Sequence, residues 1–556
     1  MLSKILLKFG SSPNRKPLEF EPGTMTVFVG TNNSGKSLIL REIEHYTEAG
    51  YQEEHNILDK LEFVLPSEEE VRKIIHQRKY VTDDPPPYGL ISVVTIQPHD
   101  GEPTEKLIHL EFIIEAIRTG ECTREFCENF IFLLKVRLDG RTRFALTEKR
   151  SSGDLQNTPT NHLLALFKDD KAREKIRNIT ADAFGLYFVI DPTGMNNLRI
   201  RMSSRPPQDS TEEQALDQRA RDFHGQAKEI SQFSDGIKAF TGIIAAVIST
   251  DYKIILLDEP EAFLHPPLAK KLGRRLTEIA AERQSHILAS THSSDFLMGC
   301  IQSGEKVNIV RLTYKQNIAT ARILPSEKIQ EMMRDPLLRS TGVLSTLFYE
   351  GAIVGEADRD RAFYQEINER LLACGEKGID NCVFLNAQNW QTIHRIIRPL
   401  REMGIPAAAI VDIDVLKGDT TPFRDLLKAA FVPQPLIDTW GVLRGNVRVI
   451  FENLNLKLKE GGISLLSGGD RETTQNLLNN FSEYGIFIVP NGEVESWLSD
   501  LKVTGDKSDW LIKVFEKMGT DPSDPNYLKP QNGDVWDFIK NVASWIANPL
   551  RKGMSE

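Results

Sequence analysis

The chain has 556 residues and a formal net charge of −10, and its 40% hydrophobic and 26% charged residues exclude the disordered and fibrous classes. At about 100–200 residues per domain, this length predicts several domains whose cores need no disulfide bonds. Five cysteines without a C-x-x-C pair exclude zinc-finger and disulfide-scaffold proteins and agree with a cytoplasmic location.

The first part of the chain predicts alternating strands and helices with a mixed middle section. Strands are expected at residues 5–9 and 25–29, and apolar residues at helical spacing predict a helix at 36–46. The mixed section continues with a charged helix at 68–78 and with strand-like runs at 90–96, 131–138 and 186–190. The polar segment 206–222 predicts a mobile loop or an exposed helix. No uncharged apolar stretch reaches about 18 residues, so no transmembrane helix and no membrane contact are expected.

Regular alternation returns at residue 230 and starts again near residue 347. The first series predicts a helix at 236–249, a strand at 253–257, a helix at 268–281 and a strand at 286–290. The second series predicts strands at 352–354, 383–385, 407–411 and 486–489, with helices at 359–372, 390–403 and 535–546. Such alternation is typical of parallel sheets covered by helices, so the predicted fold class is α/β in both halves.

A glycine-rich loop lies between the predicted strand 25–29 and the helix that follows it. Its sequence, GTNNSGKS, matches G-x-x-x-x-G-K-[ST], in which backbone N–H groups and a helix N-terminus face phosphate oxygens. Lys36 is expected to contact the β- and γ-phosphates of ATP, and the Ser37 hydroxyl to bind Mg²⁺. The predicted nucleotide-binding residues of this loop are Gly30, Asn32, Asn33, Ser34, Gly35, Lys36 and Ser37.

The strand predicted at 253–257 ends in Asp258-Glu259-Pro260. A buried strand in this position delivers Asp258 to the metal ion and Glu259 to the attacking water, for which it is placed to act as general base. An acidic strand cap is the structural alternative, and the phosphate-binding loop upstream weakens it.

Four segments, FVGTNNSGKS, FSDGIKAF, IILLDEPEAFLHP and ILASTHSSDFL, together resemble the ABC-type ATPase heads of the SMC-like and OLD (overcoming lysogenization defect) families, over about residues 1–320. The resemblance implies that Ser234 and Gly236 form a signature loop that contacts the nucleotide of a second subunit. It also implies that His292 is the switch histidine and makes Gln97 a candidate for the Q-loop glutamine. Two heads are therefore expected to enclose ATP in a homodimer or a higher homo-oligomer.

Acidic residues follow three predicted strands of the second half. They are Glu356 and Asp360, then Asp412 and Asp414, then Glu493 and Glu495, of which Glu493 is preferred. Asp412 and Asp414 point the same way if both lie on one strand, and parallel strand ends meet at one edge of a sheet. Carboxylates gathered there repel each other unless cations neutralise them, and oxygen ligands suit Mg²⁺ or Mn²⁺. Two such ions can activate water and stabilise the leaving oxygen in phosphodiester cleavage.

The segment Glu356-Ala357-Asp358-Arg359-Asp360 and the later Asp412-x-Asp414 resemble a Toprim domain, with Ala357 where the family carries glycine. The place of Glu493 and Glu495 is similar to the late glutamate of OLD-type Toprim nucleases. The resemblance implies that Glu356, Asp412, Asp414, Glu493 and Glu495 hold metal and that Glu356, Asp360, Asp412, Asp414 and Glu493 are catalytic. A lysine near such a site can stabilise developing charge, and Lys502, Lys507 and Lys513 are equal candidates.

Two groups of basic residues are candidates for contact with DNA. Lys270, Lys271, Arg274 and Arg275 form the first, and Arg395, Arg398 and Arg401 form the second, which lies in the Toprim-like part. A solvated helix face explains either group without DNA.

The chain is thus identified as an OLD-like protein. The expected domains are an ABC-type ATPase lobe at 1–100, an inserted helical and dimerisation region at 101–225, the rest of the ATPase at 226–340 and a Rossmann-like Toprim nuclease at 341–556. The family implies an ATPase and a Mg²⁺-dependent endonuclease that acts on DNA in anti-phage defence. A non-nuclease SMC-like ATPase, acting as a DNA-associated sensor or scaffold, is the alternative. The trigger, the DNA cut, and any second defence protein or RNA partner stay open.

Overall fold

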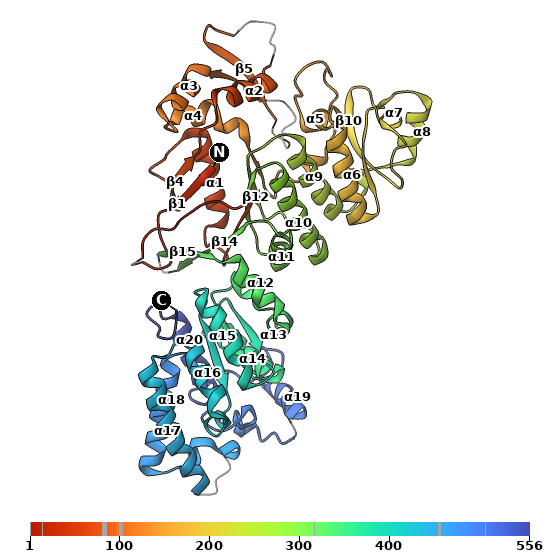
Figure 1. Ribbon diagram of the computed structural model, residues 1–556. Coiled ribbons are helices and arrows are strands. Elements are labelled where there is room, and N and C mark those ends of the chain that lie inside the picture. The colour runs from red at the N-terminus through yellow and green to blue at the C-terminus, as the bar shows by residue number, and fades with distance from the viewer. Residues whose placement is uncertain are drawn as a thin grey trace. The chain divides into compact units, whose positions relative to one another are not determined.

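The computed structural model describes residues 2–13, 15–80, 86–96, 98, 104–315, 317–453, 458–505 and 507–555, with only the backbone at 104, 460, 507 and 508. Gln97 therefore lies outside the described residues. The chain divides into two compact units, Met1–Ser326 and Glu327–Glu556 (Figure 1). This boundary precedes the one expected after residue 340. Among the described residues, none of the helices is both long enough and apolar enough to cross a lipid bilayer.

A six-stranded sheet forms the centre of the first unit. Its order is β15 (Ile318–Leu324), β14 (Val307–Lys315), β3 (Met25–Val29), β13 (His286–Ser290), β12 (Ile254–Asp258) and β7 (Lys135–Leu138). Neighbouring strands run parallel from β14 to β7, whereas β15 is antiparallel to β14. All five residues of β3 are buried, as expected for a parallel strand covered on both faces. The carboxyl ends of β3, β12 and β13 therefore share one edge of the sheet.

Four helices accompany this sheet, three of them directly after the strands β3, β12 and β13 in the chain. They are α1 (Lys36–Ala49), α9 (Asp235–Ser249), α10 (Pro266–Glu282) and α11 (Ser294–Gln302). Helix α1 contacts β7, β12 and β13, and α10 contacts β13, α9 and α11. The predicted strands and helices of this part are confirmed within a few residues at their ends.

Smaller elements complete the first unit. Three small sheets pair β2 (Glu19–Phe20), β1 (Leu2–Leu7) and β4 (Leu58–Phe63); β5 (Leu90–Thr95) and β6 (Thr104–His109); and β8 (Arg150–Ser151), β9 (Tyr187–Asp191), β10 (Asn197–Ser203) and β11 (Lys228–Glu229). The helices are α2 (Glu68–Arg78), α3 (Leu110–Thr119), α4 (Arg124–Asn129), α5 (His162–Phe167) and α6 (Asp170–Phe184).

The run 131–138 is only half a strand. Ile131–Leu134 forms a 3-10 turn whose four side chains are all buried in the core, and β7 follows. Uninterrupted apolar residues do not distinguish a buried turn from a buried strand. Because β7 pairs with β12, the central sheet includes a strand from the range expected to be the inserted region.

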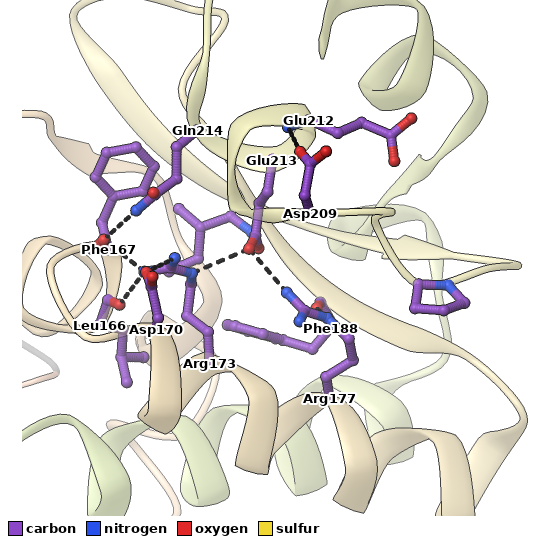
Figure 2. A network of polar contacts seen from close by, with 12 residues as sticks. Leu166, Phe167, Asp170, Arg173, Arg177, Phe188, Asp209, Glu212, Glu213 and Gln214 are labelled. Atoms are coloured by element: carbon purple, nitrogen blue, oxygen red, sulfur yellow. Dashed lines mark hydrogen bonds and ion pairs between the residues drawn. The ribbon is translucent and has the colours of Figure 1, made fainter. Parts of the chain in front are cut away.

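The segment 206–222, expected to be a loop or an exposed helix, contains helices α7 (Ser210–Gln214) and α8 (Gln218–Gln226) with two buried glutamates, Glu212 and Glu213. Glu213 lies between Arg173 and Arg177 of α6 (Figure 2). Its Oε2 atom is 3.0 Å from Nε of Arg173 and 2.8 Å from Nη2 of Arg177. Burial of a charged group is tolerated when partners neutralise it, and these partners lie about 40 residues away in the sequence. The segment is therefore helical and largely exposed, as one of the two alternatives predicted, except at the buried residues Glu212, Glu213 and Ala220.

The second unit contains a four-stranded parallel sheet. Its order is β17 (Cys382–Asn386), β16 (Gly351–Gly355), β18 (Ala407–Val411) and β19 (Ile486–Ile488). The helices of this part are α12 (Ser326–Arg334), α13 (Pro336–Ser340), α14 (Asp358–Ala373), α15 (Ile393–Glu402), α16 (Thr420–Ala429), α17 (Gln434–Asn453), α18 (Gly468–Glu483), α19 (Lys507–Met518) and α20 (Asp534–Ala547). The predicted strand–helix series is confirmed, and β16, β18 and β19 are neighbours whose carboxyl ends share an edge.

Candidate functional site

The glycine-rich loop joins β3 to α1 in a conformation that requires its glycines. Gly30 and Gly35 have φ angles of +144° and +96°, a region that residues with a Cβ atom rarely adopt. A Cβ atom on Gly30 would also lie 2.1 Å from the carbonyl oxygen of Leu312. The buried ammonium of Lys36 donates to the carbonyl oxygens of Gly30 at 2.8 Å and Thr31 at 2.7 Å. The Lys36 side chain thus folds back onto the loop that precedes it.

The loop lines a pocket of about 600 Å³ in the first unit. Its walls include Asn32, Asn33, Ser34, Gly35, Lys36, Ser37, Glu259 and His292, together with Phe9, Arg41 and Tyr314. The structure therefore brings together most of the residues predicted to bind nucleotide with two predicted catalytic ones. The hydroxyl of Ser34 is buried and has no hydrogen-bond partner among the described residues, so a phosphate oxygen fits here. Burial lowers the pKa of Lys36 to about 8, against the attraction of the nearby carboxylates.

Asp258 ends β12 beside the first residues of α1. Its Oδ1 atom accepts a hydrogen bond of 2.8 Å from the Ser37 hydroxyl and another from the Ser290 hydroxyl. Two oxygen groups that suit Mg²⁺ thus lie in contact, as predicted for Ser37 and Asp258. The hydrogen bond from Ser290 to Asp258 was not predicted, because it depends on the register in which β12 and β13 pair.

Glu259 and His292 lie together in the same pocket. The Nε2 atom of His292 is 3.7 Å from Oε1 of Glu259. A third residue, Glu261, accepts hydrogen bonds from the backbone N–H of His292 at 2.9 Å and from the hydroxyl of Thr291 at 2.7 Å. Burial raises the pKa of Glu261. Glu261 thus holds the backbone that carries His292. The sequence signal that could have indicated Glu261 was its place directly after Asp258-Glu259-Pro260.

Ser234 and Gly236 lie apart from this pocket. Ser234 is exposed and precedes α9 without a capping side-chain bond, and neither residue lines the pocket. A Cβ atom on Gly236 would lie 3.0 Å from the carbonyl oxygen of Phe263, so the loop after β12 passes close to the start of α9. A role of Ser234 and Gly236 toward the nucleotide of another subunit stays a prediction.

In the second unit, Glu356 and Asp412 directly follow the neighbouring strands β16 and β18. The backbone N–H of Asp412 donates to Oε1 of Glu356 at 2.7 Å. Asp360, 3% exposed, accepts from the backbone N–H of Ala357 at 2.9 Å and lies 3.3 Å from the guanidinium of Arg359. Burial, and then repulsion between neighbouring carboxylates, raises the pKa values of Glu356 and Asp412. These three predicted residues share one buried acidic edge of the sheet.

Asp414 and Glu493 are joined by a lysine that was not among the candidates. The strand β18 ends at Val411 and Asp414 belongs to a 3-10 turn, Ile413–Leu416, so the condition that Asp412 and Asp414 lie on one strand is not met. The ammonium of Lys459 pairs with Glu493 and lies 3.2 Å from Oδ2 of Asp414. Of the three candidates, Lys513 donates to the carbonyl oxygen of Thr504, Lys502 is exposed, and the Lys507 side chain lies outside the described part.

Oxygen atoms at this edge are left without hydrogen-bond partners. They are Oδ1 of Asp414 and both carboxylate oxygens of Glu495, counted among the described residues. Oε1 of Glu495 is 3.7 Å from the Arg359 guanidinium. The donor set fits a hard divalent cation in its chemistry. Within the described part of the chain, however, no three His, Cys, Asp or Glu side chains are arranged to hold a metal ion, so these side chains would have to turn to share one.

All members of the two basic groups except Lys270 make side-chain contacts within the protein that the structure describes. Arg401 is fully buried and donates to the carbonyl oxygens of Ala407, Tyr484, Gly485, Ala430 and Gly553. It is therefore a structural residue and not a contact for DNA. The remaining arginines and one lysine pair with acidic neighbours: Arg395 with Asp335, Arg398 with Glu402, Arg274 and Arg275 with Glu278, and Lys271 with Asp182.

One family model matches part of the first unit. A family model described as "AAA domain, putative AbiEii toxin, Type IV TA system" matches residues 196–299, which include Ser234, Asp258, Glu259 and His292. No curated protein sequence matches the chain.

Solved structures similar to the chain include SMC heads. An SmcHead bound to the C-winged helix domain of ScpA is 14% identical, with a TM-score of 0.34 over 59% of this chain and 99% of that one. The SMC head domain from Thermotoga maritima is 16% identical, with a TM-score of 0.29 over 58% and 99%. A Pyrococcus furiosus Smc head bound to the C-terminal domain of ScpA is 12% identical, with a TM-score of 0.31 over 60% and 98%. The family match is thus a likeness to an AAA-type ATPase domain over residues 196–299, the part of the chain that carries Asp258, Glu259 and His292.

Proposed function

We propose that this protein is an OLD-like, ATP-hydrolysing enzyme whose second unit is a Toprim-type, metal-dependent DNA endonuclease controlled by nucleotide state. One observation carries the nuclease assignment: carboxylates that follow three neighbouring parallel strands share one partly buried edge of the sheet, where some of their oxygens have no partner among the described residues. Homodimers or larger homo-oligomers, DNA as substrate, a cytoplasmic location and a role in anti-phage defence belong to the same proposal.

In the ATPase, phosphate oxygens replace the carbonyl partners of Lys36 when the nucleotide binds. Glu259 accepts the proton of the attacking water. His292 lies beside Glu259, and Glu261 holds the backbone of His292 in place. Ser37 and Asp258 would hold Mg²⁺, which neutralises charge on the β- and γ-phosphates. Ser234 and Gly236 from a second copy would complete the site.

In the nuclease, Glu356, Asp412, Asp414 and Glu493 would hold Mg²⁺ or Mn²⁺, with Glu495 as a further ligand, and Asp360 fixes the turn that carries Glu356. Such ions activate water and stabilise a leaving oxygen. Burial raises the pKa values of Glu356 and Asp412 and so favours their protonated forms. A bound cation would favour the ionised forms instead. Lys459 supplies the positive charge that the three earlier lysine candidates were expected to provide.

Supercoiled plasmid incubated with Mg²⁺ or Mn²⁺ tests the proposal. Wild-type protein should nick it, and Asp412→Asn and Glu356→Gln should lose about 100-fold or more of that rate, as expected when metal ligands are removed. The exposed Asp380 offers a matched control, because Asp380→Asn changes the same charge outside the cluster. Lys36→Ala should abolish the response of nicking to ATP. Plasmid that stays intact in every nucleotide state would reject the nuclease assignment.

A second candidate function is a non-nuclease, SMC-like ATPase that senses or organises DNA. The observation that favours it is the ammonium of Lys459, which pairs with two carboxylates where a metal ion would otherwise be needed. Under this alternative the second unit keeps its fold through the Lys459 pairs. Asp412→Asn would then leave every DNA-dependent property unchanged.

A further inference from the structure

Arg143 is a buried arginine that the catalytic scheme above does not use. It follows β7 after a short turn in which the backbone N–H groups of Arg141 and Thr142 donate to Asp139. Its side chain is 2% exposed and reaches the loop that follows β12. One guanidinium nitrogen donates to the carbonyl oxygens of Glu259 at 2.7 Å and Asp258 at 3.2 Å, and the other donates to Ala262 at 3.1 Å.

The loop that Arg143 binds, which follows β12, has an unfavourable backbone conformation. Glu259 and Phe263 have φ angles of +49° and +71°, which side chains with a Cβ atom adopt only when the surroundings impose them. Arg143 binds the carbonyl group of Glu259 itself and that of Ala262, the residue directly before Phe263. Its guanidinium also lies 5.9 Å from the centre of the Phe263 ring. Arg143 therefore stabilises a strained turn that aims the Glu259 side chain into the nucleotide pocket.

The other end of Arg143 rests on helix α9. A Cβ atom on Gly242 of α9 would lie 3.6 Å from the carbonyl oxygen of Arg143 and 3.0 Å from Cβ of Leu146. The loop that Arg143 binds also approaches the start of α9, because the backbone of Phe263 passes close to Gly236. The arginine thus connects the loop carrying Glu259 with the helix that begins at Ser234.

We propose that Arg143 is a positioning residue for Glu259, which sets the direction of this carboxylate by fixing its strained backbone. The inference rests on the proposed role of Glu259 as general base. Arginine suits the task because its planar fork donates to several carbonyl groups at once, whereas a lysine ammonium is a single point charge. The P-loop residues make no bond to Arg143 among the described contacts. Nucleotide binding and turnover should therefore separate when Arg143 is changed.

Arg173 provides a matched control within the same unit. It is also buried, at 1% exposed, and donates to the carbonyl oxygens of Leu166 and Phe167 and to Glu213 (Figure 2). None of these residues lines the nucleotide pocket. Arg173→Lys should therefore lower stability like Arg143→Lys without a specific effect on turnover.

The test measures ATP turnover and the affinity for a fluorescent ATP analogue in full-length Arg143→Lys, Arg143→Met and Arg173→Lys proteins. In both Arg143 variants kcat should fall about 10- to 100-fold, as expected for a misplaced catalytic group, with analogue affinity changed by less than about threefold. Arg173→Lys should keep kcat. Unchanged kcat in both Arg143 variants, or a loss of kcat matched by Arg173→Lys at equal stability, would overturn the inference.

Glu259→Gln separates this inference from the function on which it rests. If Glu259→Gln abolishes hydrolysis and Arg143→Met does not lower it, the positioning role alone is wrong. If Glu259→Gln still hydrolyses ATP at the wild-type rate, the general-base assignment is wrong, and the positioning role falls with it.

Discussion

The hydroxyl of Ser37 donates a 2.8 Å hydrogen bond to Asp258, although 221 residues separate the two in the chain. The contact exists because the parallel order of β3, β13 and β12 places both strand ends at one edge of the sheet. It joins the phosphate-binding loop directly to the acidic strand end.

From this contact we expect Asp258→Asn to lose most of the effect of Mg²⁺ on nucleotide binding. The amide keeps the hydrogen bond from Ser37 but lacks the charge that a divalent ion requires. The affinity for a fluorescent ATP analogue should fall about tenfold or more with Mg²⁺ present and stay close to wild type in EDTA. Equal losses under both conditions would mean that Asp258 acts on the loop itself and not through the ion.

At the carboxylate edge, Lys459→Met should raise the affinity for divalent or lanthanide ions. The ammonium now pairs with Asp414 and Glu493, and its removal leaves two carboxylates uncompensated. We expect about tenfold tighter binding of Tb³⁺, equal to about 1.4 kcal/mol, measured by sensitised luminescence. The exposed Lys502 serves as control, and Lys502→Met should bind Tb³⁺ like wild type. Unchanged affinity in Lys459→Met would show that the lysine and the ion do not compete.

How far the sequence predicts this site depends on how local each feature is. The P-loop and the Asp258–Glu259 pair could be predicted, because each is a contiguous pattern between a strand and a helix. Glu356 and Asp412 could also be placed, since each directly follows an apolar strand. The direction of the Asp414 side chain could not be predicted, because the backbone leaves the sheet after Val411 and Asp414 lies in a 3-10 turn.

Residues that act through distant partners could not be found in the same way. Lys459 meets Glu493 from 34 residues away, and Arg143 meets Glu259 from 116 residues away. Arg401 follows a basic pattern that suggests an exposed face, yet it is fully buried among backbone carbonyl groups. Only the packing of whole elements decides such cases.

The buried ion pairs of Figure 2 predict a large stability effect for Glu213→Ala. The change leaves Arg173 and Arg177 without their shared carboxylate in a site where water does not reach Glu213, which is 2% exposed. Breaking such a pair should lower the free energy of unfolding by about 3–5 kcal/mol, measured by urea denaturation. The exposed Glu174 of α6, the helix that carries Arg173 and Arg177, is the control, and Glu174→Ala should change the free energy of unfolding by less than about 0.5 kcal/mol.

His162 predicts a pH dependence of stability. It is fully buried, its Nε2 atom lies 2.9 Å from the carbonyl oxygen of Leu146, and burial lowers its pKa to about 4. Because the unfolded chain binds the proton more readily, stability is complete above pH 6.5 and decreases as the pH falls toward 4. The buried His162 should therefore lower the free energy of unfolding by about 2 kcal/mol at pH 5 relative to pH 7. In His162→Gln that part of the pH dependence should disappear, and an identical pH profile for the two proteins would contradict the assignment.

The binding of Mn²⁺ in crystals of the full chain, located by anomalous scattering, tests the central claim most directly. The nucleotide site provides an internal reference, because Ser37 and Asp258 should bind the ion when ATP is present. The account predicts a second peak in contact with Glu356 and Asp412, with Lys459 displaced from Asp414. A peak at Ser37 and Asp258 alone, with the Lys459 pairs intact at saturating Mn²⁺, would contradict the proposed cutting site.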